Sequence, residues 1–380
     1  TASKTGTQTE AHKMKNNEKH MREPLFHITK RSDIVWWKAW IIRAVAIIAA
    51  LVVCSFVIIA LTKYNPLQVY KTMVEGSFGS ERKIWILFQN IAMLLCISLA
   101  VTPAFKMRFW NLGAEGQVLI GGLASAACMF YFKDSLPNGL LIPIMLAASI
   151  LGGIIWGVIP AFFKANWGTN ESLFTLMMNY VATQLVAFFI MVWVPSGSSV
   201  MGVINQMTRS GWLPDIFGKK YLLNIIVVAV VTVIMFVYLK YSKQGYEISV
   251  VGESENTARY IGINVKKVII RTMVISGAVC GLAGFLLVSG TNHTVSANLA
   301  GGMGFTAIMV SWLAKFNPVV MTLTSFLIVF LQRGAGEIAT AFRLNESVSD
   351  ILTGIIIFFI IGCEFFINYR INLRSKKEAK

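Results

Sequence analysis

The sequence predicts an all-α fold: a polytopic transmembrane helical bundle with about ten spans. Apolar residues make up 56% of the 380 residues and charged residues only 14%, whereas a soluble protein needs about 25% charge on its surface. The mean hydropathy is +0.65. The apolar residues also gather in runs long enough to cross ~30 Å of hydrocarbon, which takes about 20 residues at 1.5 Å per residue.

Ten such runs follow one another along the chain. They cover approximately 37–62, 84–103, 112–132, 139–163, 173–194, 221–240, 268–290, 299–316, 318–333 and 349–368. The first exceeds the apolar region of a signal peptide and no small-residue cleavage site follows it, so we expect it to be retained. The eighth and ninth are the least defined, because Asn317-Pro318 can equally join a helical hairpin or a re-entrant pair.

The distribution of basic residues predicts that both termini are cytoplasmic. With that orientation, 24 of the 34 Lys and Arg residues fall on the cytoplasmic side, as the positive-inside rule requires. The net charge of +16 then lies where the anionic inner leaflet attracts it, which argues against nucleic acid as a partner. We expect a polar basic tail over 1–35, disordered, then a transmembrane domain over 36–370 and a second basic cytoplasmic tail over 371–380.

The motifs of common enzymes are absent from the sequence. It contains no GxxxxGK[ST] phosphate loop, no HExxH and no GxSxG. Its five cysteines lie in apolar runs and its four histidines are scattered, so local spacing predicts neither a metal site nor a redox site. We therefore predict no catalytic residues. The sequence does contain two GxxxG patterns, Gly153–Gly157 and Gly277–Gly281, which indicate close helix packing in a membrane.

Polar residues cluster at the starts of the third and fifth runs. A carboxylate in hydrocarbon is unfavourable and normally faces the bundle interior or water, so these residues are candidates for a substrate pathway. Glu115 and Asn111 are four residues apart and would share one face of a helix. Helix capping with interfacial solvation is the alternative explanation. The candidates are Asn111, Glu115, Gln117, Asn170, Asn179 and Gln184.

A loop of about 241–267 is the second feature of interest. Ser254 can cap a short helix from about Glu255 to Ile261, in which Glu255 and Arg259 form an i,i+4 pair and Gly262 provides the stop. Such a helix could lie on lipid headgroups or contact another protein.

Four segments resemble the permease subunits of bacterial ABC importers for nucleosides, within the group that includes ribose-type and branched-chain amino-acid permeases. They are NLGAEGQ at 111–117, GTNESLFTLMMNYVA at 168–182, GYEISVVGESENTARYIGI at 245–263 and GGMGFTAIMVSWLAKFNP at 301–318. Their order and spacing fit from about residue 35 to 370, and the Gly-x-Glu-Gly-Gln element is the most specific. The sequence departs from the family pattern in its N-terminal tail and at Phe174-Thr175-Leu176.

The resemblance implies a permease like those of type II importers, in the bacterial plasma membrane, working by alternating access. It implies three partners: a second related permease, a cytoplasmic ATPase that holds ATP and Mg, and a lipid-anchored substrate-binding protein. This chain would bind no cofactor itself. The loop at 241–267 would then couple the permease to the ATPase. The coupling residues would be Gly252, Glu253, Glu255, Ala258, Arg259, Tyr260 and Gly262.

Two other functions stay open at this point. One is a permease of the same architecture for a free sugar such as ribose. The other is an ion-coupled secondary carrier, which the sequence disfavours because Asp350 and Glu364 lie near the ends of their run.

Overall fold

Helices form nearly all of the regular structure in the computed structural model, which describes residues 26–31, 35–62, 65–194, 201–343 and 345–373. The elements are β1 (Phe26–Lys30), α2 (Trp36–Thr62), α3 (Pro66–Phe78), α4 (Glu81–Lys106), α5 (Ala114–Tyr131), α6 (Asn138–Trp167), α7 (Glu171–Trp193), α8 (Leu222–Tyr241), α9 (Lys243–Glu253), α10 (Glu255–Tyr260), α11 (Val265–Leu287), the π-helical turn η2 (Val288–Asn292), α12 (Met303–Leu313), α13 (Pro318–Ala341), α14 (Glu346–Asn368) and β2 (Tyr369–Leu373). The chain divides into a smaller unit, 1–63 with 354–380, and a larger unit, 64–353.

The predicted fold class is confirmed, and each of the ten predicted runs contains one helix. Within the described residues, eight helices are long and apolar enough to cross a membrane. The other two are α5, with 18 residues and Glu115 in its first turn, and α12, with 11 residues. At 1.5 Å per residue α12 covers only about 16 Å, so this helix alone is too short to span the bilayer.

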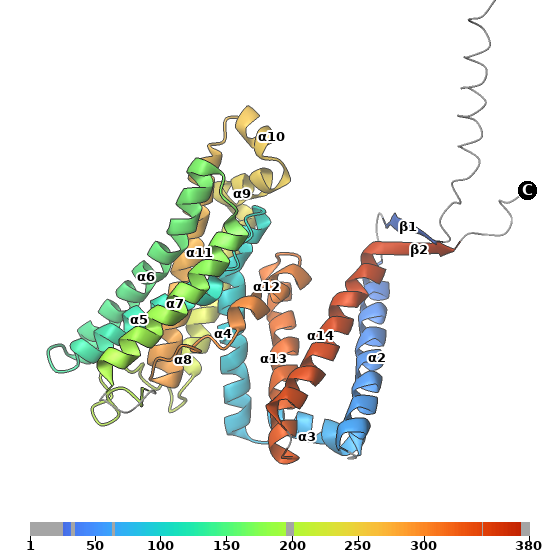
Figure 1. Ribbon diagram of the computed structural model, residues 1–380, viewed down its shortest axis with the longest axis horizontal. Coiled ribbons are helices and arrows are strands. Elements are labelled where there is room, and N and C mark those ends of the chain that lie inside the picture. Colours follow the sequence, from blue (N-terminus) through green and yellow to red (C-terminus); the bar gives the residue numbers. More distant parts are fainter. Residues whose placement is uncertain (1–25, 32–34, 63–64, 195–200, 344, 374–380) are drawn as a thin grey trace, which may run out of the picture. The chain divides into compact units, whose positions relative to one another are not determined.

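The larger unit is built around α4 and α11 (Figure 1). In the apolar stretch of each of these two helices, 72% of the residues are buried. Helix α6 packs along α11 at glycines from both GxxxG patterns. A Cβ added at Gly153 would lie 2.8 Å from the Cα of Gly281, and one added at Gly277 would lie 2.9 Å from the Cα of Ile154. The backbones of the two helices are therefore in direct contact. Such contact is expected between membrane helices, because lipid provides no hydrophobic driving force for their association and small residues let the backbones approach closely.

The smaller unit holds a two-stranded antiparallel sheet, in which Phe26 pairs with Leu373 and Lys30 with Tyr369. Both strand sequences alternate apolar and polar residues, which is the pattern of a strand. The sheet thus includes part of the segment expected to be a disordered tail, whereas 1–25 lie outside the described residues.

In the same unit, Arg43 of α2 forms an ion pair with Glu364 of α14 at 2.6 Å.

Helix α3 follows the first span and was not expected from apolar length. Its start is nevertheless encoded locally: Asn65 accepts a hydrogen bond from the backbone N–H of Leu67 at 3.0 Å, and Pro66 occupies the first helical position. At the far end of α4 the chain turns at Met107 and runs through 108–113 to α5. The polar residues singled out by the sequence lie around that connection.

Candidate functional site

The start of α5 is capped by a residue from another helix. Its N-cap position is Gly113, which has no side chain to bond the free backbone N–H groups of the first turn. Asn179 of α7 provides the missing cap. Its Oδ1 accepts from the N–H of Gly116 at 2.9 Å, and its Nδ2 donates to the carbonyl of Leu112 at 2.8 Å. Asn179 therefore fixes both sides of the turn that leads into α5.

The start of α12 is capped in the same way, by Glu115. The N-cap position is Gly302, with φ +76 and no side-chain bond. The carboxylate of Glu115 accepts from the N–H of Gly302 at 2.9 Å and from the N–H of Gly304 at 2.7 Å. An anion at a helix N-terminus satisfies free donors and is favoured by the helix dipole, which accounts for a carboxylate in this half-buried position.

Gly304 allows this close approach between α12 and α5. A Cβ at Gly304 would lie 2.6 Å from the backbone nitrogen of Glu115 and 2.7 Å from its Oε2. Both distances are shorter than real Cβ contacts. Any larger residue at 304 would therefore push the carboxylate off the helix start.

Asn111 precedes α5 and does not share a helical face with Glu115, contrary to the expectation from their spacing. Residues 108–113 leave the helix because the chain must turn between α4 and α5, with Arg108 at φ +62. The fully buried Asn111 donates to Ser276 Oγ at 3.3 Å and accepts from the N–H of Gly113 at 3.0 Å and from Gln117 Nε2 at 3.3 Å. It anchors the turn to α11.

Gln117 is the residue of this group with a free polar atom. Its side chain is 1% exposed, and its Oε1 has no hydrogen-bond partner among the described residues. Trp156 Nε1 on α6 is likewise buried and unpartnered within the described part of the chain. The site thus offers one buried acceptor and one buried donor, where a water or a substrate group could bind.

The other two pathway candidates lie on the surface of this chain. Asn170 caps α7, accepting from the N–H groups of Ser172 at 3.1 Å and Leu173 at 3.2 Å, and Gln184 is exposed on α7. Sequence reasoning missed Thr175, whose hydroxyl accepts from the N–H of Leu112 at 3.1 Å. Its position one turn before Asn179, inside the segment that resembles the family, was the available signal.

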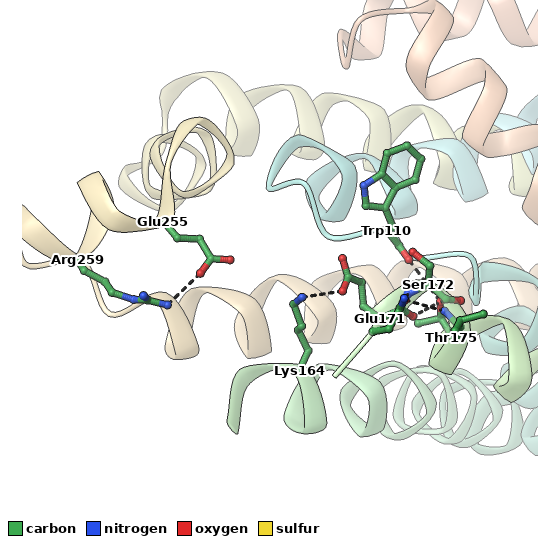
Figure 2. Close-up of polar contacts among 9 residues, drawn as sticks. Trp110, Lys164, Glu171, Ser172, Thr175, Glu255 and Arg259 are labelled. Carbon is green, nitrogen blue, oxygen red and sulfur yellow. Dashed lines mark hydrogen bonds and ion pairs between the residues drawn. The ribbon is translucent and has the colours of Figure 1, made fainter. Parts of the chain in front are cut away.

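An ion pair joins the end of α6 to the start of α7 beside this site. Lys164 contacts Glu171 at 2.7 Å, and Figure 2 shows this pair together with Thr175, which bonds back to the carbonyl of Glu171 at 2.7 Å. The same figure shows the Glu255–Arg259 pair of α10. The two pairs lie near each other, because Lys164, Glu255 and Arg259 line the same cavity.

The loop predicted to couple the chain to a partner contains two helices. Helix α10 and its features are confirmed: Ser254 Oγ accepts from the N–H of Thr257 at 3.2 Å, Arg259 contacts Glu255 at 2.9 Å, and Gly262 has φ +85. Helix α9 precedes it and was not expected, because its sequence is rich in glycine and β-branched residues. Its formation depends on burying Ile248 and Val251.

The two helices of this loop differ in how firmly they are attached. Gly252 at the end of α9 packs against the Lys106 carbonyl at the end of α4, and Arg271 of α11 contacts Glu247 of α9 at 2.9 Å. In α10, Ala258 is fully buried, whereas Tyr260 is 92% exposed. Glu253, Glu255 and Arg259 are also exposed.

A cavity of about 660 Å³ lies beside α10. Its lining includes Lys164 from α6, Glu255 and Arg259 from α10 and Lys266 from α11. Within the described residues, no group of three or more His, Cys, Asp or Glu side chains is placed to hold a metal ion. The loop therefore presents a charged helix next to a groove.

These features define a multi-pass membrane protein with an ordered helical loop at one end of its bundle, as in transport permeases. The chain belongs to the family described as the branched-chain amino acid transport system / permease component, whose model matches residues 84–361.

Three relatives cover most of this chain. The guanosine ABC transporter permease protein NupP of Bacillus subtilis is 29% identical over 343 residues, which is 89% of this chain and 97% of the relative. The nucleoside ABC transporter permease protein NupB of Lactococcus lactis is 28% identical over 307 residues, covering 78% and 84%. The glucose ABC transporter permease protein TsgB13 of Haloferax volcanii is 26% identical over 354 residues, covering 90% and 92%.

Proposed function

We propose that this chain is the membrane-spanning subunit of an ATP-driven importer that carries nucleosides across a bacterial plasma membrane, with both termini cytoplasmic. The observation that carries the proposal is the exposed helix α10, held by a buried Ala258 and flanked by α9, which is fastened to α4 and α11. The relatives named for guanosine and nucleosides support the choice of substrate.

The partners follow from the same proposal. A cytoplasmic ATPase would hold ATP and Mg and dock on α10 through Gly252, Glu253, Glu255, Ala258, Arg259, Tyr260 and Gly262. A second related permease would complete the membrane part, and a lipid-anchored binding protein would deliver the substrate. This chain would bind no cofactor and would not hydrolyse ATP.

The site at the start of α5 would then act as the gate of the substrate pathway. Motion of α9 and α10 reaches α4 and α11 through Gly252 and the Arg271–Glu247 pair. Helix α11 bonds to Asn111, and Asn111 holds the turn before α5. The permease would have two states, one in which Glu115 caps α12 and one in which it does not. ATP binding would shift the equilibrium between these two states.

A sugar is the second candidate substrate, because the glucose permease relative covers 90% of this chain. Gln117 Oε1 and Trp156 Nε1 would serve a sugar hydroxyl as well as a ribose hydroxyl. Competition experiments separate the two substrates.

The test is transport by proteoliposomes that contain this chain, its second permease, the ATPase and the binding protein. We expect ATP-dependent accumulation of a radiolabelled nucleoside, inhibited by excess unlabelled nucleoside and unaffected by excess ribose or glucose. Vesicles without the ATPase are the control and should accumulate nothing. If only a sugar inhibits accumulation, the substrate is a sugar and not a nucleoside. Accumulation by vesicles without the ATPase would indicate a secondary carrier.

A further inference from the structure

A second cavity lies at the end of the larger unit opposite α10, and none of the residues discussed so far lines it. Its volume is about 430 Å³, within the range of about 300–1,000 Å³ that is typical of small-molecule sites. Three segments meet there: Asn138 at the start of α6, the segment 203–221 before α8, and 290–293 after α11. The sequence predicts all three on the outer side of the membrane, or at its edge.

The walls of this outer cavity are held together by main-chain and side-chain hydrogen bonds. The N–H of Ile204 donates to the carbonyl of His293 at 2.8 Å, and the N–H of Leu213 donates to the carbonyl of Ser289 at 3.0 Å. The N–H of Gly211 donates to Asn138 Oδ1 at 2.9 Å. The loop before α8 is thus fastened to the ends of α6 and α11, so the cavity is formed before any ligand binds.

Part of the wall is flat and aromatic. The rings of Trp212 and His293 stack with their centroids 3.7 Å apart and their planes 5° apart. Trp212 is fixed by a hydrogen bond from its Nε1 to the carbonyl of Ile204 at 3.0 Å. Planar nucleobases stack on such rings largely irrespective of base identity.

The backbone around the cavity adopts unusual conformations. Asn205, Arg209 and His293 have φ of +54, +53 and +53, in the left-handed region that residues other than glycine rarely occupy. Such conformations are unfavourable, persist only when surrounding contacts enforce them, and cluster at functional sites. Here they bring Arg209 and His293 into the lining.

The polar groups of the lining suit a neutral ligand with several hydroxyl and amide groups. His293 Nδ1 is buried and has no partner among the described residues. Burial, and then the charge of Lys220, lower the pKa of His293, which favours the neutral ring with its one donor and one acceptor. Asp215, Lys220 and Arg209 add both charge signs, and Tyr221 adds a hydroxyl.

We propose that this cavity is a substrate site for a nucleoside, the first that the substrate occupies on this chain, with the base against the Trp212–His293 stack and the ribose hydroxyls near Asp215 and Tyr221. The inference rests on the proposed function and adds a location to it. A free sugar has no planar ring to place against the stack and should bind here much more weakly.

The test measures binding to the complex of both permeases and the ATPase in lipid nanodiscs, without the binding protein. Equilibrium binding of a radiolabelled purine nucleoside should be saturable and resistant to excess ribose. His293→Asn keeps a residue that tolerates positive φ but removes the ring, and Asp215→Asn removes one charge; each should weaken binding about tenfold. Met207→Ala is the control, since Met207 lies in the same loop, is 98% exposed and is outside the lining.

Several results would overturn the inference while leaving the proposed function standing. One is nucleoside uptake by the complete importer without saturable binding to the nanodisc complex. A second is binding that neither variant weakens, which would locate the site elsewhere. A third is that the His293→Asn and Asp215→Asn variants lose uptake because the binding protein docks on them more weakly. The outer cavity would then be part of a protein interface. Failure of the proposed function itself has a different signature: the complete wild-type importer would take up no nucleoside.

Discussion

The start of α5 and helix α10 both carry charged and amide side chains, but these side chains have different roles. At the start of α5, Glu115 and Asn179 bond to backbone groups of other segments, and Asn111 is fully buried. At α10, Glu255 and Arg259 bond mainly to each other at the surface, with side chains 48% and 61% exposed. The first set holds the bundle together, and the second leaves its charges available to a partner.

This difference predicts that substitutions at the two places fail in different assays. Loss of a buried acceptor leaves a donor without a partner, which costs about 1–3 kcal/mol per group, whereas exposed pairs contribute about 0–1 kcal/mol.

The largest effect should come from Glu115→Leu. This change leaves the N–H groups of Gly302 and Gly304 without an acceptor and should lower the free energy of unfolding by about 2–4 kcal/mol. Glu115→Gln retains one acceptor oxygen and should cost about half as much. Thermal unfolding of the purified protein measures both. Gln184→Leu on the exposed face of α7 is the control and should change little, and an equally stable Glu115→Leu would contradict the capping role.

An intermediate effect is expected from Asn179→Ala, which removes the cap of α5. We expect a loss of about 1–2 kcal/mol, as for other helix caps. The double variant with Glu115→Gln should deviate from additivity by more than about 0.5 kcal/mol, because Asn179 holds the first turn of α5 and that turn carries Glu115. Thr183→Ala, one turn further along α7, removes a hydroxyl bonded within its own helix and serves as the control. Strict additivity would show that the two caps act independently.

The smallest effect on stability should come from Arg259→Glu, within about ±0.5 kcal/mol, because the site is exposed. Its effect on assembly should be large: the ATPase should no longer co-purify with the permease. Lys71→Glu reverses a similar exposed i,i+4 pair with Glu75 on α3, near the other end of α4, and should leave assembly intact. If the Arg259→Glu complex keeps its ATPase, α10 is not the docking helix.

Local signals were sufficient for the helices of the ten apolar runs and for α10. Apolar runs of span length predicted the positions of ten helices, and Ser254, the Glu255–Arg259 pair and Gly262 predicted the limits of α10, because caps and i,i+4 pairs act over a few residues. Residues 241–253 carry no local helix signal, because helix α9 is stabilised by burial of Ile248 and Val251, which local propensity does not register.

Contacts between distant segments could not be predicted from one sequence. Glu115 lies 187 residues from Gly302, and Asn179 lies 63 residues from Gly116, so neither cap leaves a local pattern. Capping of the nearest helix by Asn111 or Asn170 can be predicted from the sequence, but a side chain that caps a distant helix cannot. The Trp212–His293 stack was missed for the same reason, since these residues are joined only when the loop folds back onto η2.

The pairing of β1 with β2 fixes the parity of the membrane crossings. Residues 26 and 373 are neighbours in one sheet, so they lie on the same side of the membrane and the chain between them must cross it an even number of times. Eight described helices are long enough to cross, and α5, which joins the end of α4 to the start of α6, makes a ninth crossing. The tenth crossing must therefore be completed by the segment 294–313, in which the short helix α12 covers only part of the distance. Glu115 holds the point where the turns that precede α12 become helical.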